Sequence, residues 1–277
     1  EGRLGQRVQP QIVPISDIDQ PCAVTLTNAS FIENEAALCG GAILNTAWFL
    51  PEYDYAPPDR ASAQGGSILS EDAVVVLITA TLHSNESSLF GGGVCNGATL
   101  TGTNVWLSNN KSGWGGGVSN LDAGLLEALY FFVMAGGGDS PPDVSSPAAP
   151  QGESWLSTLT ERMAQASAAA DPVCSHPASL DLTNAVFDRN QAWGVMIPLS
   201  GIGQAPGLAG ALLNGMTYPP LGPLGANDWA RLTNVTFSFN ESFEVGVTET
   251  VESFTSVLMN LAYGEMTNCI VWGNRGA

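Results

Sequence analysis

The stretch Gly91–Asn120 reads GGGVCNGATLTGTNVWLSNNKSGWGGGVSN and contains one short sequence twice. It opens with GGGVCN at 91–96 and closes with GGGVSN at 115–120, so equivalent asparagines stand 24 residues apart. Between them lies TNVWLSNN at 103–110, whose alternation of apolar and polar residues is typical of a β-strand. We interpret this stretch as one full turn of a repeating β structure, and the rest of the chain as altered copies of it.

Two motifs alternate along the chain. The first has the form Leu-Thr-Asn-x-x-Φ-x-x-Asn, where Φ is apolar, and the second has the form Gly-Gly-small-Φ-x-Asn. The first occurs as LTNASFIEN (26–34), LITATLHSN (77–85), GTNVWLSNN (102–110), LTNAVFDRN (182–190), LTNVTFSFN (232–240) and MTNCIVWGN (266–274). The second occurs as GGAILN (40–45), GGGVCN (91–96), GGGVSN (115–120), AGALLN (209–214) and TSVLMN (255–260). Self-similarity at such a period is typical of a solenoid.

The strand motif predicts which side chains face the interior. In the first copy Thr27, Ala29 and Phe31 are expected to point inward, and Asn28 and Ser30 outward. Parallel strands stacked at about 4.8 Å would then form an internal apolar column from Phe31, Leu82, Leu107, Phe187, Phe237 and Val271. The last asparagine of each motif is predicted to lie at a turn and to bond its neighbours in a ladder: Asn34, Asn85, Asn110, Asn190, Asn240 and Asn274. The Gly-Gly pairs suit turns that need positive φ or close backbone approach.

The predicted fold is therefore all-β: one right-handed parallel β-helix over residues 1–277, with about five to six coils. Two long insertions interrupt it, at 46–70 and 121–177. The second is expected to hold one or two short helices, over Ala123–Ala135 with Asp122 as cap and over Ser154–Ala170. The sequence starts at Glu1 and stops within a repeat, so we expect a processed chain or a segment of a longer one. In solenoids insertions map to loops on defined faces, often the binding face, and here Trp48, Phe49, Tyr53 and Tyr55 are the candidate partner contacts.

Composition excludes several classes of partner. The net charge is −18, with 8 Lys and Arg against 26 Asp and Glu among 277 residues. Binding to nucleic acid needs clustered basic residues, and docking on anionic lipid needs the same. The longest apolar run, 124–136, is too short to cross a bilayer, so direct membrane insertion is not expected.

Cysteines and sequons favour an extracellular or cell-surface location. The disulfide candidates are Cys22, Cys39, Cys95, Cys174 and Cys269, and fifteen ways of forming two bridges stay open. The glycosylation candidates are Asn28, Asn85, Asn110, Asn234 and Asn240. Asn85, Asn110 and Asn240 belong to the expected internal ladder and could not carry glycans there, whereas Asn28 and Asn234 have outward parity.

The motifs also resemble a known family. GGAI at 40–43 and FIEN at 31–34, recurring as GGGV and as FDRN or FSFN, are similar to the GGA[ILV] and FxxN repeats of chlamydial polymorphic membrane protein adhesins. MTNCIVWGN at 266–274 resembles right-handed parallel β-helix repeat proteins of cell surfaces. The resemblance covers about half of the residues, and it implies the β-helix fold and an adhesin or recognition role.

The alternative enzyme class is a polysaccharide lyase or glycosidase. Such sites need paired carboxylates, or Ca²⁺ held by several acids with a basic residue. The candidate groups are Asp17, Asp19, Asp181, Asp188, Arg189, His83 and His176, and no acids recur at matched positions of adjacent repeats. His83 follows the inward Leu82 and is expected to face outward. No catalytic residue or metal ligand is assigned, no cofactor is expected, and the spacing supports no Ca²⁺ site.

The function expected from the sequence is a non-catalytic surface protein. A structural component of a surface filament or coat is favoured, with protein partners or further copies of the chain docked on the insertions. Adhesion, with protein or glycan ligands, is the alternative. The polysaccharide-acting enzyme is the second alternative.

Overall fold

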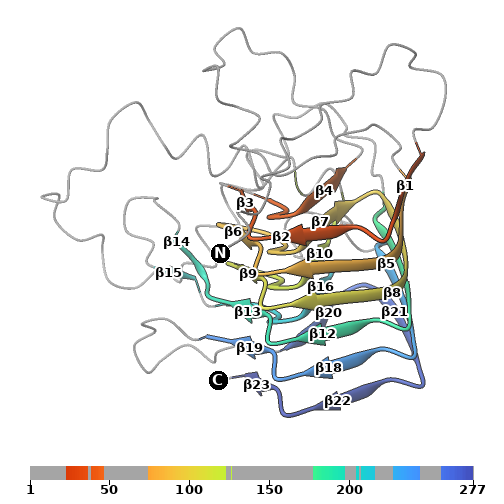
Figure 1. Cartoon of the computed structure of the whole chain (residues 1–277). Coiled ribbons are helices and arrows are strands. Elements are labelled where there is room, and N and C mark those ends of the chain that lie inside the picture. Colours follow the sequence, from red (N-terminus) through yellow and green to blue (C-terminus); the bar gives the residue numbers. More distant parts are fainter. Residues whose placement is uncertain are drawn as a thin grey trace, which may run out of the picture.

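The computed structural model describes residues 23–36, 39–46, 74–122, 126, 177–196, 204–205, 207–215, 227–243 and 257–276. This part of the chain is almost entirely β-structure arranged in stacked parallel sheets (Figure 1). Within it, Leu126 has helical conformation and donates its N–H to the Asp122 carbonyl at 3.0 Å. The remainder of the helices expected in 121–177 lies outside the described residues.

Ten described strands form the main sheet. Every pairing in it is parallel, and strands of the same motif in successive repeats lie side by side (Figure 1). Its members are β1 (Ala23–Thr27), β2 (Ser30–Ile32), β5 (Val74–His83), β8 (Thr99–Ser108), β11 (Ser179–Thr183), β12 (Val186–Asp188), β17 (Trp229–Thr233), β18 (Thr236–Ser238), β21 (Tyr263–Thr267) and β22 (Ile270–Trp272).

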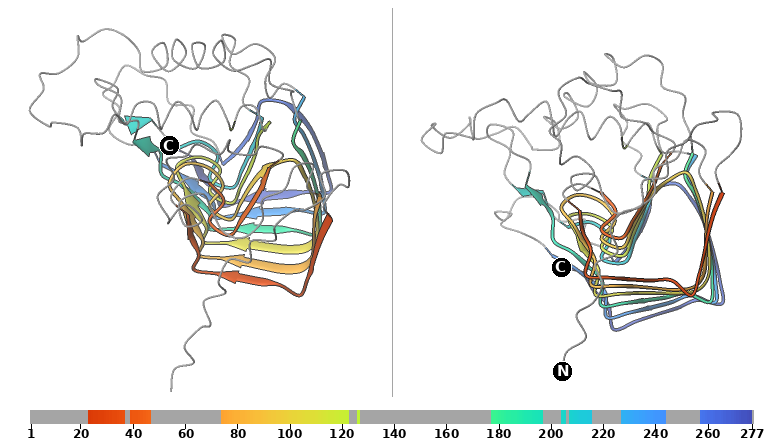
Figure 2. Two further views of the ribbon diagram at one scale, coloured as in Figure 1. Left: turned by 90° about the horizontal axis from the view of Figure 1, so that it is seen from above. Right: turned by 45° about the horizontal axis from the view of Figure 1, so that its top comes forward.

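Two further parallel sheets are built from the turns of the same repeats (Figure 2). The second sheet contains β4 (Ile43–Thr46), β7 (Val94–Gly97), β10 (Val118–Asn120), β16 (Leu212–Asn214) and β20 (Leu258–Asn260). The third contains β3 (Glu35–Ala36), β6 (Glu86–Ser87), β9 (Lys111–Ser112), β13 (Gln191–Ala192), β19 (Glu241–Ser242) and β23 (Arg275–Gly276). A short antiparallel pair joins β14 (Val195–Met196) and β15 (Gln204–Ala205). The three parallel sheets are compatible with a β-helix or another solenoid.

The apolar column predicted from the sequence is confirmed by the strand register. Phe31 pairs with Leu82, Leu82 with Leu107, and so on to Val271. The rings of Phe187 and Phe237 stack with their centroids 4.8 Å apart, which equals the usual spacing of neighbouring strands. Stacking side chains of one kind on one face is therefore what fills the interior.

The predicted inward direction of Thr27 is wrong. Thr27 is exposed, and Leu26 packs against the core instead. The reason is Asn28, which has φ of 54° and turns the chain through a corner, so the alternation restarts after it. Ala29 and Phe31 face inward as predicted.

The same corner has a left-handed residue in all six repeats. Five of these residues are asparagine, which tolerates this conformation because its short polar side chain can bond locally: Asn28, Asn104, Asn184, Asn234 and Asn268. The sixth is Thr79, with φ of 54°. A β-branched residue is strained there.

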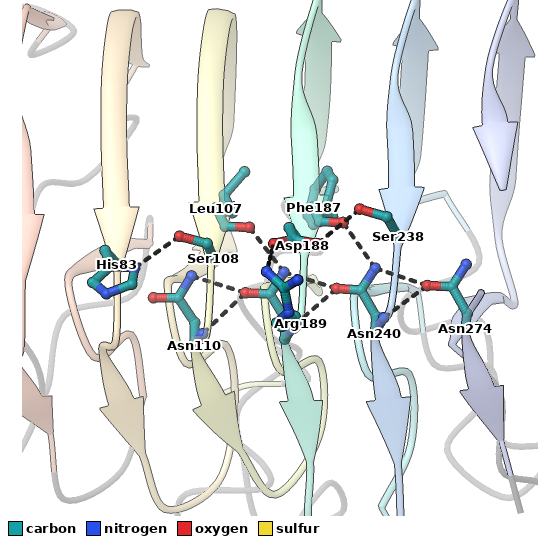
Figure 3. A network of polar contacts seen from close by, with 11 residues as sticks. His83, Leu107, Ser108, Asn110, Phe187, Asp188, Arg189, Ser238, Asn240 and Asn274 are labelled. Carbon is teal, nitrogen blue, oxygen red and sulfur yellow. Dashed lines mark hydrogen bonds and ion pairs between the residues drawn. The ribbon is translucent and has the colours of Figure 1, made fainter. Parts of the chain in front are cut away.

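Internal asparagines tie the repeats together at the next corner, as the sequence predicts (Figure 3). Asn110 is buried, and its Oδ1 accepts from the backbone N–H and the Nδ2 of Asn85 at 3.0 and 2.9 Å. Its Nδ2 donates to the Leu82 carbonyl and to Asn190 Oδ1, each at 2.9 Å. The pattern continues through Asn240 to Asn274. A second ladder follows the same logic in the second sheet, through the buried Asn45, Asn96, Asn120 and Asn214 to the exposed Asn260.

The Gly-Gly motif turns the chain between the third and second sheets. Gly91 has φ of +60°, which favours glycine over any residue with a side chain. Gly92 has a different reason, since a Cβ there would collide with the carbonyl oxygens of Lys111 and Gly116. The next repeat therefore approaches too closely for any larger residue.

Thr79→Asn is expected to stabilise the fold by about 1 kcal/mol, because it removes β-branched strain at a left-handed position. Urea unfolding would measure the change. Thr81→Asn is the matched control, since Thr81 lies two residues away in the extended part of β5. Equal effects of the two substitutions would contradict the role assigned to the corner.

Asn110→Ala is expected to destabilise the fold by about 3–5 kcal/mol, since it leaves several buried backbone and amide groups unpaired. Lys111→Ala, at the outward neighbour, should change stability by no more than about 1 kcal/mol. The same unfolding measurement compares them. A loss below 1 kcal/mol for Asn110→Ala would show that the ladder is not what holds the repeats.

Candidate functional site on the outer face of the main sheet

A line of polar side chains crosses the outer face of the main sheet where its strands end (Figure 3). We call it the outer polar column; its members are His83, Ser108, Asp188 and Ser238. Each is the last residue of a strand, one position before the left-handed residue of the next corner. Period-2 alternation puts these residues outward because the preceding residue of each strand belongs to the apolar column.

Hydrogen bonds link the column in pairs. His83 Nδ1 lies 2.8 Å from Ser108 Oγ, and Ser238 Oγ donates to Asp188 Oδ1 at 2.9 Å. Asp188 Oδ2 also receives the Arg189 guanidinium at 2.6 Å. Both oxygens of this carboxylate are therefore engaged, one by a neighbouring strand and one by the adjacent residue.

The column contains serine, histidine and aspartate, but not in the order that nucleophilic catalysis uses. A reactive serine needs a histidine that is itself oriented by a carboxylate on its far side. Here Ser108 stands between the strands of His83 and Asp188, so histidine and carboxylate are two strand spacings apart, roughly 10 Å. Ser108 is also only 6% exposed. The geometry suits cross-strand hydrogen bonding.

Aromatic side chains continue the outer face toward the last repeat. Phe239 and Trp272 meet edge to face with centroids 4.5 Å apart, and the Arg189 guanidinium lies 5.4 Å from the Phe239 ring centroid. Both rings are exposed, Trp272 by 53%. Partly exposed aromatics beside an arginine are the residue types enriched at protein contacts.

The acids considered for catalysis in the sequence are separated by the fold. Asp181 lies on β11 in a different outward column from Asp188, and both acids are paired with arginine. Arg231 bridges Asp181 at 3.7 Å and Glu265 at 3.4 Å while lying over the Trp229 ring. These side chains are about a third to two thirds exposed, so each pair contributes at most about 1 kcal/mol. Asp17, Asp19 and His176 lie outside the described residues.

A buried carboxyl that the sequence did not single out joins the two ends of the longest insertion. Asp228 Oδ2 accepts the N–H of Asp122, at the start of that insertion, and Oδ1 accepts the N–H of Ala178, just after its end, both at 2.9 Å. Burial raises the pKa of Asp228 from 3.8 to about 7, although these two backbone bonds oppose the rise. The available sequence signal was weak: an acid directly before a strand that follows an insertion.

Three of the candidate cysteines fall in the described ranges, and there Cys39, Cys95 and Cys269 are free thiols. The expected disulfide is therefore not present among them, and Cys22 and Cys174 lie outside these ranges. The partner-contact candidates Trp48, Phe49, Tyr53 and Tyr55 also lie outside them.

The sequons divide between buried and exposed positions. Asn85, Asn110 and Asn240 are buried, with both Nδ2 hydrogens donated to neighbours. Asn28 and Asn234 are exposed at the first corner, and Asn234 Nδ2 donates to Asn184 Oδ1 at 3.0 Å. A glycan on the amide of a buried ladder residue would displace one of those bonds.

The described segments contain no cluster of three or more His, Cys, Asp or Glu side chains arranged to hold a metal ion. No helix in them has the length and apolar character needed to cross a membrane.

Comparison of the chain with protein-family models, with curated proteins and with solved structures finds no match.

Asp228 should make the fold less stable as pH rises. Its folded pKa of about 7 lies above the unfolded value near 3.8, so the folded chain binds the extra proton. The associated stability is fully present below pH ~4 and is lost as pH rises through ~7, a loss of up to roughly 4 kcal/mol.

Urea unfolding of the native protein and of Asp228→Asn between pH 4 and pH 8 measures this effect. The substitution should flatten the pH dependence over that range, whatever its effect at a single pH. Ser119→Ala, a buried polar change in the second sheet, should leave the slope unchanged. An unchanged slope in Asp228→Asn would contradict the assignment.

Proposed function

We propose that the chain is a non-catalytic surface protein, built as a right-handed parallel β-helix of about five to six coils, which serves as a structural component of an extracellular filament or coat. One observation carries this proposal. Two internal asparagine ladders join each described repeat to the next in one hydrogen-bond direction, so the repeats stack in a single linear direction.

Within the described residues, Val271 is exposed at the edge of the sixth repeat. It occupies the same column as Phe237 but is 57% exposed, whereas Phe237 is fully buried. Met266 on the same edge is 43% exposed, although its equivalents Leu232 and Leu182 are buried. An exposed strand edge with apolar side chains is a template for pairing with another β segment.

The hydrogen-bond polarity of the ladders favours a second copy as the occupant, docked head to tail. In the inner ladder each Nδ2 donates to the Oδ1 of the following repeat, from Asn34 at one end to Asn274 at the other. Asn274 therefore presents donors at its edge of the sheet, and Asn34 presents its Oδ1 at the opposite edge. The outer asparagines run the other way, since Asn268 donates to Asn234 and Asn234 to Asn184.

Charges would also be complementary between two copies docked head to tail. Along the third sheet, Arg275 of β23 pairs with Glu241 of β19, and Glu35 of β3 stands at the first position of that row. Head-to-tail stacking would add Glu35 of a second copy to the free side of Arg275. Opposite charges directly across a strand pair contribute about 0.2–1 kcal/mol.

Adhesion is the second candidate function. Exposed Trp272 and Phe239, with Arg189, form an aromatic and cationic contact surface on the outer face. Such a surface suits a protein or glycan ligand, in line with the resemblance to polymorphic membrane protein repeats. The chain insertions leave the sheets at recurring corners and would add further contacts.

Self-association of the full chain tests the filament proposal. Sedimentation velocity over a range of concentrations should reveal assemblies, and Val271→Arg should weaken the association by about tenfold or more, since it places a charge in the contact. Thr267→Arg is the matched control, because Thr267 faces outward on the same edge.

A chain that stays monomeric at every concentration, or equal weakening by the two substitutions, would overturn the filament role. Binding of the monomer to immobilised glycans or cell-surface proteins would then support adhesion. Release of unsaturated sugars from pectin-like polymers would overturn the non-catalytic role altogether.

A further inference from the structure

The two thiols of Cys39 and Cys95 come together at the Gly-Gly turns of the first two repeats. Cys39 stands in the same stacked row as Phe90 and Trp114, one residue before each turn. Cys95 stands in the row of Leu44 and Ser119, five residues later. Within one repeat these two rows face each other across the turn, as Ser119 Oγ donating to the Trp114 carbonyl at 3.0 Å shows.

The stacking of repeats places the Cys39 segment of the first repeat beside this turn of the second repeat. The N–H of Gly40, next to Cys39, donates to the Phe90 carbonyl at 2.9 Å. That carbonyl corresponds to the Trp114 carbonyl, which the side chain of residue 119 contacts in the third repeat. Residue 95 corresponds to residue 119. The backbone register therefore directs the Cys95 side chain toward the segment that carries Cys39.

The electrostatics of Cys95 agree with this register. A hydrogen bond between the Cys39 and Cys95 thiols, together with burial, raises the pKa of Cys95 well above its usual value. Cys95 is fully buried, whereas Cys39 is partly exposed. The accessible thiol of the pair is thus Cys39. The buried Cys95 thiol is placed to react second, after Cys39.

We propose that Cys39 and Cys95 form a redox-active thiol pair that closes into a disulfide between the first and second repeats. The oxidant belongs to the class of small-molecule disulfides, such as oxidised glutathione. The Cys39 thiolate attacks one sulfur of that disulfide, which forms a mixed disulfide and releases one glutathione thiolate. Cys95 then gives up its proton and displaces the second glutathione, so two protein thiols are oxidised and one glutathione disulfide is reduced to two thiols.

This assignment selects one pairing from those that the sequence leaves open. Cys269 lies in the sixth repeat, where its Sγ contacts the carbonyls of Leu232 and Thr267 at 3.5 and 3.4 Å. The first and sixth repeats stand at opposite ends of the stacked sheets. Cys269 therefore serves as the internal control for nonspecific oxidation.

Peptide mapping of the full chain tests the proposal. The protein would be equilibrated with oxidised glutathione, blocked with an alkylating reagent, digested without reduction and analysed by mass spectrometry. A peptide linking Cys39 to Cys95 is expected, and it should disappear in Cys39→Ser but persist in Cys269→Ser. Alkylation of both thiols, stable glutathione on Cys39 alone, or linkage of Cys39 to Cys22 or Cys174 would each overturn it.

A second measurement keeps the test independent of folding defects in one variant. The oxidised chain should unfold at higher urea concentration than the reduced chain, because the crosslink restrains the unfolded state across the insertion between the two repeats. Cys39→Ala, at the partly exposed position, should abolish that difference, and Cys269→Ala should retain it. An equal urea midpoint for the oxidised and the reduced native protein would contradict the proposed disulfide.

Discussion

The side-chain amide of one internal asparagine per repeat is the interaction on which the stacked sheets depend. At that corner the backbone leaves the main sheet, and strand pairing no longer satisfies its N–H groups. The Oδ1 of the next asparagine accepts both the backbone N–H and the Nδ2 of the one before it. Successive ladder residues stand 51, 25, 80, 50 and 34 residues apart in sequence, yet the contacts are the same. The amide thus fixes the register whatever length of chain intervenes.

The same constraint explains where variation is tolerated. The Gly-Gly turn is closed by backbone contacts too short for an extra side chain, as at Gly92. The outer face has no such limit, and there equivalent positions carry histidine, serine, aspartate and tryptophan: His83, Ser108, Asp188 and Trp272. Interior positions are therefore mostly repetitive, whereas the outer positions differ from repeat to repeat.

The sequence predicted the repetitive part of the fold well, because each repeat independently carries the same spacing of residues. The apolar column, the inner ladder and the glycine turns follow from local spacing and were confirmed. The inward direction predicted for Thr27 was wrong because the left-handed Asn28 interrupts the alternation. The spacing within a single strand motif does not show that the chain turns a corner there. The bonds of Asp228 and the stacking of the Cys39 and Cys95 segments could not be predicted, since both involve different repeats whose register is set by stacking. Because long insertions separate the repeats, distances along the sequence do not predict that register.

A directional ladder has two unlike ends, and this bears on how such a structure can associate. Two identical ends brought together would oppose donors with donors at Asn274, or acceptors with acceptors at Asn34. Head-to-tail contact opposes donor with acceptor in the inner ladder, and it does the same for the outer asparagines because they run in reverse. A closed twofold dimer through these edges would leave amide groups unpaired, at a cost of about 1–3 kcal/mol for each buried group. The polarity of the hydrogen bonds therefore favours open, linear association over closed pairing.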